Sequence, residues 1–366
     1  MNRTEQNRTR IAWLDYARML AIICVVITHT TEAVYQMNAE NLMKYSLHRR
    51  IFAITMFTGG RLGVPIFLFL TGYLLLDRPY YGERYRTFLK EKCLGLLLTT
   101  EIWIIIYNIF NSLFWNTPFD VEKCLLNLLF LKSTEMGHMW YMPVIIGIYL
   151  FVPFVANALS NIDIKVFCIP LLFAFAYRFI VPSMNIWLAA SGQQLISNLP
   201  DLSFSGNEYG FMVLLGYLVK KGIFNRIHSF VFMILGTVGF VFTVIIQNYA
   251  DMHGYSYNVW YDSATLLVAG LSIFILLSRA RLNPRKLVRS ISVASFGIYL
   301  IHNLILIPLK RYYQPGMSSV SRLAIVFAAT FFMAWACVLI IERIAPLAQL
   351  LLFQKSFENK SDKISC

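Results

Sequence analysis

Charged side chains are scarce in this sequence. They make up 14% of its 366 residues, whereas 58% of the residues are hydrophobic. Soluble domains carry about 25% charged residues, so no aqueous fold would hide this much apolar surface in a single core. The solvent of the chain must therefore be the hydrocarbon of a lipid bilayer.

Disulfide and metal-ligand patterns are also lacking. The six cysteines form no CxxC motif and no Cys/His spacing, and most of them fall inside apolar runs. A disulfide framework or a zinc site would need such spacings, so neither is indicated and we expect no metal. Long polar stretches are missing as well: the longest segments between apolar runs are 115–137 and 184–207. We therefore expect the chemistry to lie within the membrane.

Apolar runs long enough to cross a bilayer recur along the whole chain. A helix needs roughly 18 or more mostly apolar residues to cross about 30 Å of hydrocarbon. The runs are rich in Leu, Ile and Phe at helix length, which favours helices over the alternating strands of a barrel. The sequence predicts an all-α polytopic membrane protein of about ten transmembrane helices, at 17–36, 53–76, 93–114, 138–156, 166–183, 208–219, 230–247, 262–278, 291–309 and 322–342.

Lys and Arg are unevenly distributed between the two sides that these helices define. With the N-terminus inside, most of the 32 basic residues fall on the inner side, and the loops at 184–207 and 248–261 contain none. Basic flanks stay in the cytoplasm. We expect cytoplasmic segments at 1–16 and 344–366 and a membrane domain at 17–343. Anionic inner-leaflet lipids balance the net charge of +13, so nucleic acid is not needed as a partner.

The first predicted helix carries an ionisable stripe. At about 100° per residue, Asp15, Arg18, His29 and Glu32 fall within roughly 100° of arc. Ionisable groups inside membranes are costly and usually mark function. An imidazole suits proton transfer near neutral pH and a guanidinium suits phosphate, so His29 is a candidate base and Arg18 a candidate phosphate ligand. The alternative is that Asp15 and Arg18 anchor the helix at the interface and His29 bonds a neighbouring helix.

Three other polar positions fall in or beside predicted helices. His302 lies at a depth similar to that of His29, and His138 opens the fourth helix from outside, where it has either a substrate role or a structural role in an aromatic belt. Glu101 must find a partner in space, with Arg61 and Arg178 as the candidates.

Two further segments carry patterns. GGRLGVPIFLFLTGYLLL mixes glycines and a proline with apolar residues, which predicts close helix packing and a locally broken helix. RPYYGERYRTFLKEK follows it and is basic and aromatic. That composition is expected of an ordinary cytoplasmic loop and also of a site that binds phosphate.

These residues resemble the acyltransferase-3 family of bacterial membrane O-acyltransferases, in particular stand-alone enzymes similar to enterobacterial common antigen O-acetyltransferase. The similarity runs over nearly the whole chain. The family's first-helix Arg and His match Arg18 and His29, with Asp15 at the preceding family position. HMWYMP, LLGYLVKK and SFGIYLIH resemble three later family segments, and the last of them places His302 on the family's ninth-helix His. The second-helix pattern is matched by Arg61, Val64, Pro65, Phe67, Gly72 and Tyr73, with Thr71 in place of the family's more frequent Ser.

The resemblance implies that cytoplasmic acetyl-CoA donates an acyl group to a sugar hydroxyl. The catalytic candidates are His29, as general base or transient acyl carrier, with Glu32 and His302. The candidates for binding acyl-CoA are Arg18, Arg61, Arg84, Arg86, Lys90 and Lys92. The candidates for binding the acceptor are Asp15, Thr71, His138, Trp140 and Asn303. Donors to the oxyanion stay open among Arg61, Thr71, His302 and Asn303.

Several alternatives remain at this point. A transporter or flippase of a lipid-linked sugar or small solute would also suit a bundle with buried ionisable groups, and a membrane scaffold is a third class. Within the enzyme class, the acceptor is a cell-surface or lipid-linked glycan, or instead peptidoglycan, an antibiotic, a lipid or an amino acid. The resemblance implies a multi-pass protein of the bacterial inner membrane and a single-module enzyme, and leaves the oligomeric state open.

Overall fold

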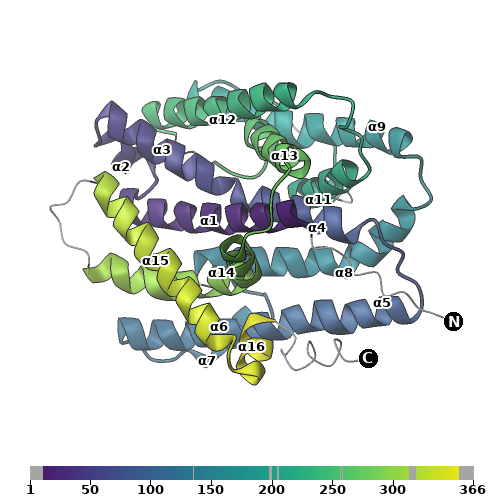
Figure 1. Ribbon diagram of the computed structural model, residues 1–366. Helices are drawn as coiled ribbons and strands as arrows, with labels where there is room; N and C mark the ends of the chain where they lie inside the picture. The colour runs from purple at the N-terminus through teal and green to yellow at the C-terminus, as the bar shows by residue number, and fades with distance from the viewer. Residues whose placement is uncertain are drawn as a thin grey trace.

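The computed structural model describes residues 11–134, 136–197, 200–203, 206–255, 257, 259–312 and 319–353. Within these residues the chain is built of helices and contains no strand (Figure 1). The first half contains α1 (Ala12–Tyr35), α2 (Ala39–Met43), α3 (Leu47–Arg61), α4 (Gly63–Leu75), α5 (Glu83–Phe88), η1 (Leu89–Leu94), α6 (Gly95–Trp115), α7 (Val121–Leu128), η2 (Gly137–Trp140) and α8 (Tyr141–Leu159). The second half contains α9 (Ile164–Phe175), η3 (Ala176–Ile180), α10 (Val181–Ala190), α11 (Asn207–Lys220), α12 (Ser229–Met252), α13 (Ala264–Arg279), α14 (Lys286–Tyr312), α15 (Ser319–Ile341) and α16 (Ala345–Leu352).

All ten predicted membrane segments are helical. Eight described helices are long and apolar enough to cross a membrane. The other two are shorter: α11 has 14 residues and α13 has 16, so α11 extends only about 21 Å at 1.5 Å per residue. The protein is thus an all-α polytopic membrane protein. The small helices α2, α5, α7 and α16 were not among the predicted membrane segments, because they are short or polar.

Helix α1 lies in the middle of the bundle (Figure 1). It packs against α3, α4, α14 and α15, and its residues Ala17, Ala21, Ile22 and Val26 are completely buried. Small side chains at this face let neighbouring helices approach closely, which is how membrane helices gain packing energy without a hydrophobic driving force. The central position of α1 is what surrounds its polar stripe with other helices instead of lipid.

The glycine-rich segment packs and breaks as predicted. A Cβ on Gly63 would lie 2.6 Å from the backbone oxygen of Ala21 in α1, so only glycine allows this approach. The helix is interrupted between Arg61, the end of α3, and Gly63, the start of α4. Pro65 has no N–H to donate to the carbonyl four residues earlier, which explains a break at this position.

Helices α4 and α11 pack through a matched pair of glycines. A Cβ on Gly72 would overlap the carbonyl oxygen of Val213, and one on Gly216 would overlap that of Phe69. The helices run in the same direction, because Lys221 Nζ donates to Asp77 Oδ1 at 2.7 Å just beyond their C-terminal ends. This hydrogen bond raises the pKa of Lys221 above its ordinary value. The pair fixes α4, which forms one wall of the cavity described next.

Both described ends of the chain lie on the same side of the bundle. Ile11 and Leu14, near the first described residue, and Phe353, the last one, line one open cavity of about 630 Å³. This agrees with the predicted topology, in which an even number of crossings returns the chain to its starting side. That this side faces the cytoplasm remains a prediction from the distribution of Lys and Arg.

Candidate active site

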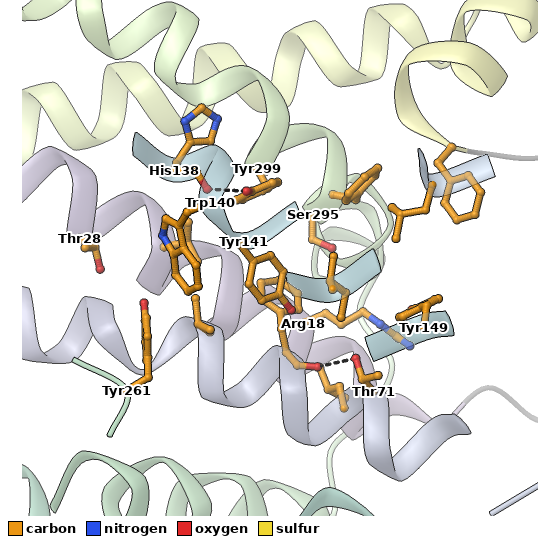
Figure 2. A pocket seen from close by; sticks show the side chains of 18 of the residues that line it. Arg18, Thr28, Thr71, His138, Trp140, Tyr141, Tyr149, Tyr261, Ser295 and Tyr299 are labelled. Atoms are coloured by element: carbon orange, nitrogen blue, oxygen red, sulfur yellow. Dashed lines mark hydrogen bonds between the residues drawn. The ribbon is translucent and has the colours of Figure 1, made fainter. Parts of the chain in front are cut away.

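A cavity of about 370 Å³ runs beside α1 (Figure 2). We call it the central cavity. Arg18 and His29 both line it, and eleven residues of helix place them about 16 Å apart along the α1 axis. Its apolar walls come mainly from α4 and α8, and Tyr299 on α14 and Tyr261 before α13 close further sides. A cavity of this size, largely apolar with a few polar groups, is typical of a small-molecule or cofactor site.

Three histidines from distant parts of the chain meet at one end of the central cavity. His29 is on α1, His138 on η2 and His302 on α14. The His29 ring centroid lies 5.2 Å from that of His302 and 6.1 Å from that of His138, and the last two are 4.9 Å apart. Despite this proximity, the described residues include no group of His, Cys, Asp or Glu arranged to hold a metal ion.

A carboxylate fixes the orientation of the His29 ring. His29 Nδ1 lies 3.0 Å from Glu32 Oε2. A carboxylate only accepts hydrogen bonds, so Nδ1 carries the proton and the neutral ring keeps a lone pair on Nε2. Histidines that act as bases are held in this way, because the carboxylate orients the ring and stabilises its charged form.

Arg61 continues this chain of contacts. Its NH2 lies 3.5 Å from Glu32 Oε1, and its NH1 donates to the Tyr261 hydroxyl at 3.4 Å. The guanidinium also lies over the rings of Phe57 and Trp260, at 4.6 and 5.3 Å from their centroids. Aromatic faces stabilise a buried cation. Arg61 is therefore held rigidly at the histidine end of the cavity, away from Arg18.

His302 is enclosed by protein. It is completely buried, and its Nδ1 donates to the backbone oxygen of Tyr299 at 2.6 Å. A carbonyl oxygen accepts only, which leaves the His302 Nε2 as an acceptor. No described atom bonds that Nε2.

The ring of His138 has the opposite arrangement. Its Nδ1 accepts from the amide of Asn303 at 2.6 Å, which leaves the proton on Nε2. The Tyr299 hydroxyl donates to the His138 backbone oxygen at 2.6 Å, a contact that Figure 2 shows as a dashed line. His138 lines the central cavity, and its Nε2 is buried with no described protein partner. It therefore offers a buried N–H donor at the cavity.

The other end of the central cavity is a wider opening. We call this opening the Arg18 mouth; it is lined by Asp15, Arg18, Lys92, Ser292, Ser295 and Phe353, among others. Asp15 is buried and accepts from the Ser292 hydroxyl at 2.7 Å, and its Oδ1 lies 3.7 Å from Arg18 NH1. Lys92 Nζ lies 5.5 Å above the Phe353 ring. Two cations thus stand at the opening, where they suit a phosphate.

The sequence of residues 11–342 matches the family described as an acyltransferase domain. This match covers almost the whole chain and decides its family. The chain belongs to the acyltransferase-3 family. The chain is also 23% identical over 342 residues to an amino-acid racemase of Enterococcus faecalis. The alignment covers 88% of this chain and 45% of the relative, so the chain spans about half the length of that protein. No solved structure matches the chain.

The predicted binding residues lie in different parts of the structure. Trp140 and Thr71 line the central cavity, and the Thr71 hydroxyl donates to the Phe67 oxygen in its own helix. Asn303 lies behind His138. Of the predicted basic run, Lys92 lines the Arg18 mouth. The remaining members of that run, on α5 and η1, are exposed and line neither cavity: Arg84, Arg86 and Lys90.

The predicted ion pair of Glu101 is wrong. Glu101 was expected to pair with Arg61 or Arg178. Arg61 contacts Glu32 instead, and Arg178 NH2 lies 2.8 Å from Glu208 Oε2. Each arginine pairs with a carboxylate on another helix. Residue spacing within one helix cannot reveal such a pair.

Two tyrosines at this site, Tyr261 and Tyr299, were not predicted from the sequence. Tyr261 lies in the segment before α13 and binds Arg61, so no helical periodicity pointed to it. Tyr299 stands three residues before His302 on the same helix and binds the segment that carries His138. The spacing of Tyr299 and His302, about one helical turn, was a signal that would have placed Tyr299 beside the site.

Proposed function

We propose that this acyltransferase moves an acetyl group from cytoplasmic acetyl-CoA to a hydroxyl of a cell-surface or lipid-linked polysaccharide in the bacterial inner membrane. The observation that carries the proposal is the central cavity itself, which joins cations at one end to a carboxylate-held histidine at the other. An acyl donor with a charged head and a long arm ending in a thioester fits such a cavity. Family membership supports acyl transfer, and the donor and acceptor are our inference.

Donor binding would use the Arg18 mouth. Arg18 and Lys92 would hold the phosphates of CoA, since charge-assisted hydrogen bonds to phosphate are among the strongest that side chains make. The pantetheine arm would follow the apolar wall of the cavity past Val25, Leu70 and Leu74. The acetyl group would then arrive near His29, about 16 Å along α1 from Arg18.

His29 is the proposed general base. Its Nε2 takes the proton from the acceptor hydroxyl while the hydroxyl oxygen attacks the thioester carbonyl carbon. The tetrahedral intermediate then breaks its carbon–sulfur bond, and the proton on His29 passes to the leaving thiolate. Glu32, itself held by Arg61, stabilises the charged imidazole between these two steps. The products are an O-acetyl ester and free CoA.

The negative charge of the intermediate needs a donor. His138 is well suited, because it lines the cavity and its Nε2–H has no described protein partner. A preorganised donor of this kind contributes about 3 kcal/mol to stabilisation of the transition state. The oxyanion donors left open in the sequence included Asn303, and here Asn303 instead fixes the ring of His138.

Release of CoA from acetyl-CoA tests the proposal. Purified protein in detergent is incubated with [14C]acetyl-CoA and a membrane glycan extract, and free thiol and labelled glycan are measured together. The proposal predicts equal amounts of thiol and of alkali-labile label on the glycan. Movement of a lipid-linked sugar across proteoliposomes with no thiol release would instead favour the transporter or flippase alternative.

A further inference from the structure

A third hollow lies at the opposite end of α1 from Arg18. It has a volume of about 410 Å³, and we call it the basic cavity. Its lining includes Gln36, Asn41, Lys44, Lys310 and Arg322. These residues come from the end of α1, from α2, from the end of α14 and from the start of α15, which Figure 1 draws together at the left of the bundle.

The basic cavity lies further along α1 and α14 than the histidines of the central cavity. Ala33 and Gln36 line it and follow His29 by four and seven residues, which is about 6 and 10 Å along the helix. Lys310 follows His302 by eight residues on α14, about 12 Å along that helix. Two helices therefore lead from a histidine into the basic cavity, and away from the Arg18 mouth.

The basic cavity concentrates positive charge on the predicted outer side of the membrane. Lys44, Lys310 and Arg322 line it, and its described lining contains no carboxylate. Lys44 donates to Glu40 Oε1 at 2.7 Å and to Asn41 Oδ1 at 3.2 Å. The predicted outer loops at 184–207 and 248–261 contain no Lys or Arg, as the positive-inside rule leads one to expect. An anionic ligand would explain why three cations line the basic cavity, close to the histidine end of the central cavity.

We propose that the basic cavity binds a phosphate of the acceptor, which makes the acceptor a phosphate-bearing glycan. The inference rests on the acyl transfer proposed above and names the acceptor class. An arginine fork and lysine ammonium groups suit a phosphate or pyrophosphate. A phosphate in this cavity lies about 10 Å from His29 along α1, which leaves space between them for the sugar that carries the hydroxyl. Bilayer lipid headgroups offer the same phosphate chemistry, so the test separates the two sources.

The binding arm uses inorganic pyrophosphate. Purified protein in maltoside micelles is first saturated with CoA, so that the Arg18 mouth is occupied, and pyrophosphate binding is measured by calorimetry. The double variant Lys310→Gln with Arg322→Gln should bind pyrophosphate about tenfold more weakly or worse. Arg311→Gln is the matched control, because Arg311 is the neighbour of Lys310 but donates to the Phe114 backbone oxygen. Equal affinity in the double variant and the control overturns the proposal.

The transfer arm uses one glycan in two forms. A polyprenyl-pyrophosphate glycan extract is compared with the same extract after mild acid has removed the pyrophosphate, and labelled acetyl transfer is measured. Wild-type protein should prefer the phosphate-bearing form by about tenfold in kcat/KM, and the double variant should lose that preference. Phosphatidylglycerol is also added to the wild-type protein. If it causes the same loss of transfer as the double variant shows, the cavity binds membrane lipid, and the acceptor role is overturned.

Failure of this inference is distinguishable from failure of acyl transfer. Thiol release from acetyl-CoA depends on the Arg18 mouth and His29, and the double variant leaves both unchanged. If the wild type transfers acetyl groups but shows no preference between the two glycan forms, the phosphate site is wrong and acyl transfer stands. If no thiol is released with any glycan, acyl transfer itself is wrong.

Discussion

The two ends of the central cavity are built differently. At the histidine end, His29, His138 and His302 are each fixed through Nδ1 by a separate partner, and His138 and His302 are buried. At the Arg18 mouth, the Arg18 side chain is 31% exposed and Lys92 is exposed. A rigid end suits bond making, because catalytic groups must be preorganised. An open end suits a flexible, charged donor that enters and leaves.

The largest difference between the ends should appear when His29 is removed. His29→Ala should lower kcat about a thousandfold, because a positioned general base contributes roughly 10²–10⁴-fold. The dissociation constant of the His29→Ala protein for CoA should change less than about twofold, since the Arg18 mouth is intact. Single-turnover acetyl transfer and equilibrium CoA binding measure the two effects. His48→Ala, at an exposed position on α3, is the control, and a His29→Ala protein with wild-type kcat would refute the role of the base.

A smaller loss at the same end should follow from Glu32→Gln. The amide keeps the shape of the side chain but removes the negative charge that stabilises protonated His29 and pairs with Arg61. We expect kcat to fall about 10 to 100-fold with CoA affinity unchanged. Comparison of kcat and KM for acetyl-CoA checks this. A rise in KM for acetyl-CoA with unchanged kcat would show that Glu32 acts on donor binding. The two ends would then not differ in function as proposed.

The reverse pattern is expected at the Arg18 mouth. Arg18→Ala should weaken CoA binding about tenfold or more, because a charge-assisted hydrogen bond contributes about 1.5–3 kcal/mol. At saturating acetyl-CoA, kcat should stay within about threefold of wild type. Isothermal calorimetry with CoA and with dephospho-CoA measures the binding. Unchanged affinity for both ligands would contradict a phosphate role for Arg18.

The smallest expected effects show which basic residues of α5 and η1 contribute to the Arg18 mouth. Lys92→Gln should raise KM for acetyl-CoA a few-fold, because Lys92 lines the mouth. Arg84→Gln, Arg86→Gln and Lys90→Gln should each change it less than about twofold, as exposed charges contribute little. Steady-state kinetics of the four variants in one detergent give the ranking. A larger effect from Lys90 than from Lys92 would move the phosphate site onto α5 and η1.

Much of this arrangement was accessible from the sequence where one helix carries the information. The 3.6-residue period placed Asp15, Arg18, His29 and Glu32 on one face of α1. Pro65 and its neighbouring glycines predicted the break between α3 and α4. In both cases the cause is local, so spacing along the chain is enough to reveal it.

The rest depends on packing between distant segments. Asn303 meets His138 across 165 residues, and Tyr261 meets Arg61 across 200. No pattern within either segment specifies its partner. His138 had an alternative interpretation as an interfacial histidine for this reason, and the structure shows instead that it lies with His29 and His302. Contacts of this kind are fixed by the three-dimensional packing of the helices.

The proposed mechanism requires one acyl-CoA to occupy both ends of the central cavity at once. A cryo-electron microscopy structure with an acetyl-CoA analogue, in which a methylene group replaces the thioester sulfur, tests it most directly. We expect phosphate density beside Arg18 and Lys92 and the carbonyl carbon near His29, with room for an acceptor oxygen about 3–3.5 Å from that carbon. Analogue density outside the central cavity, or with its acyl end turned away from His29, would contradict it.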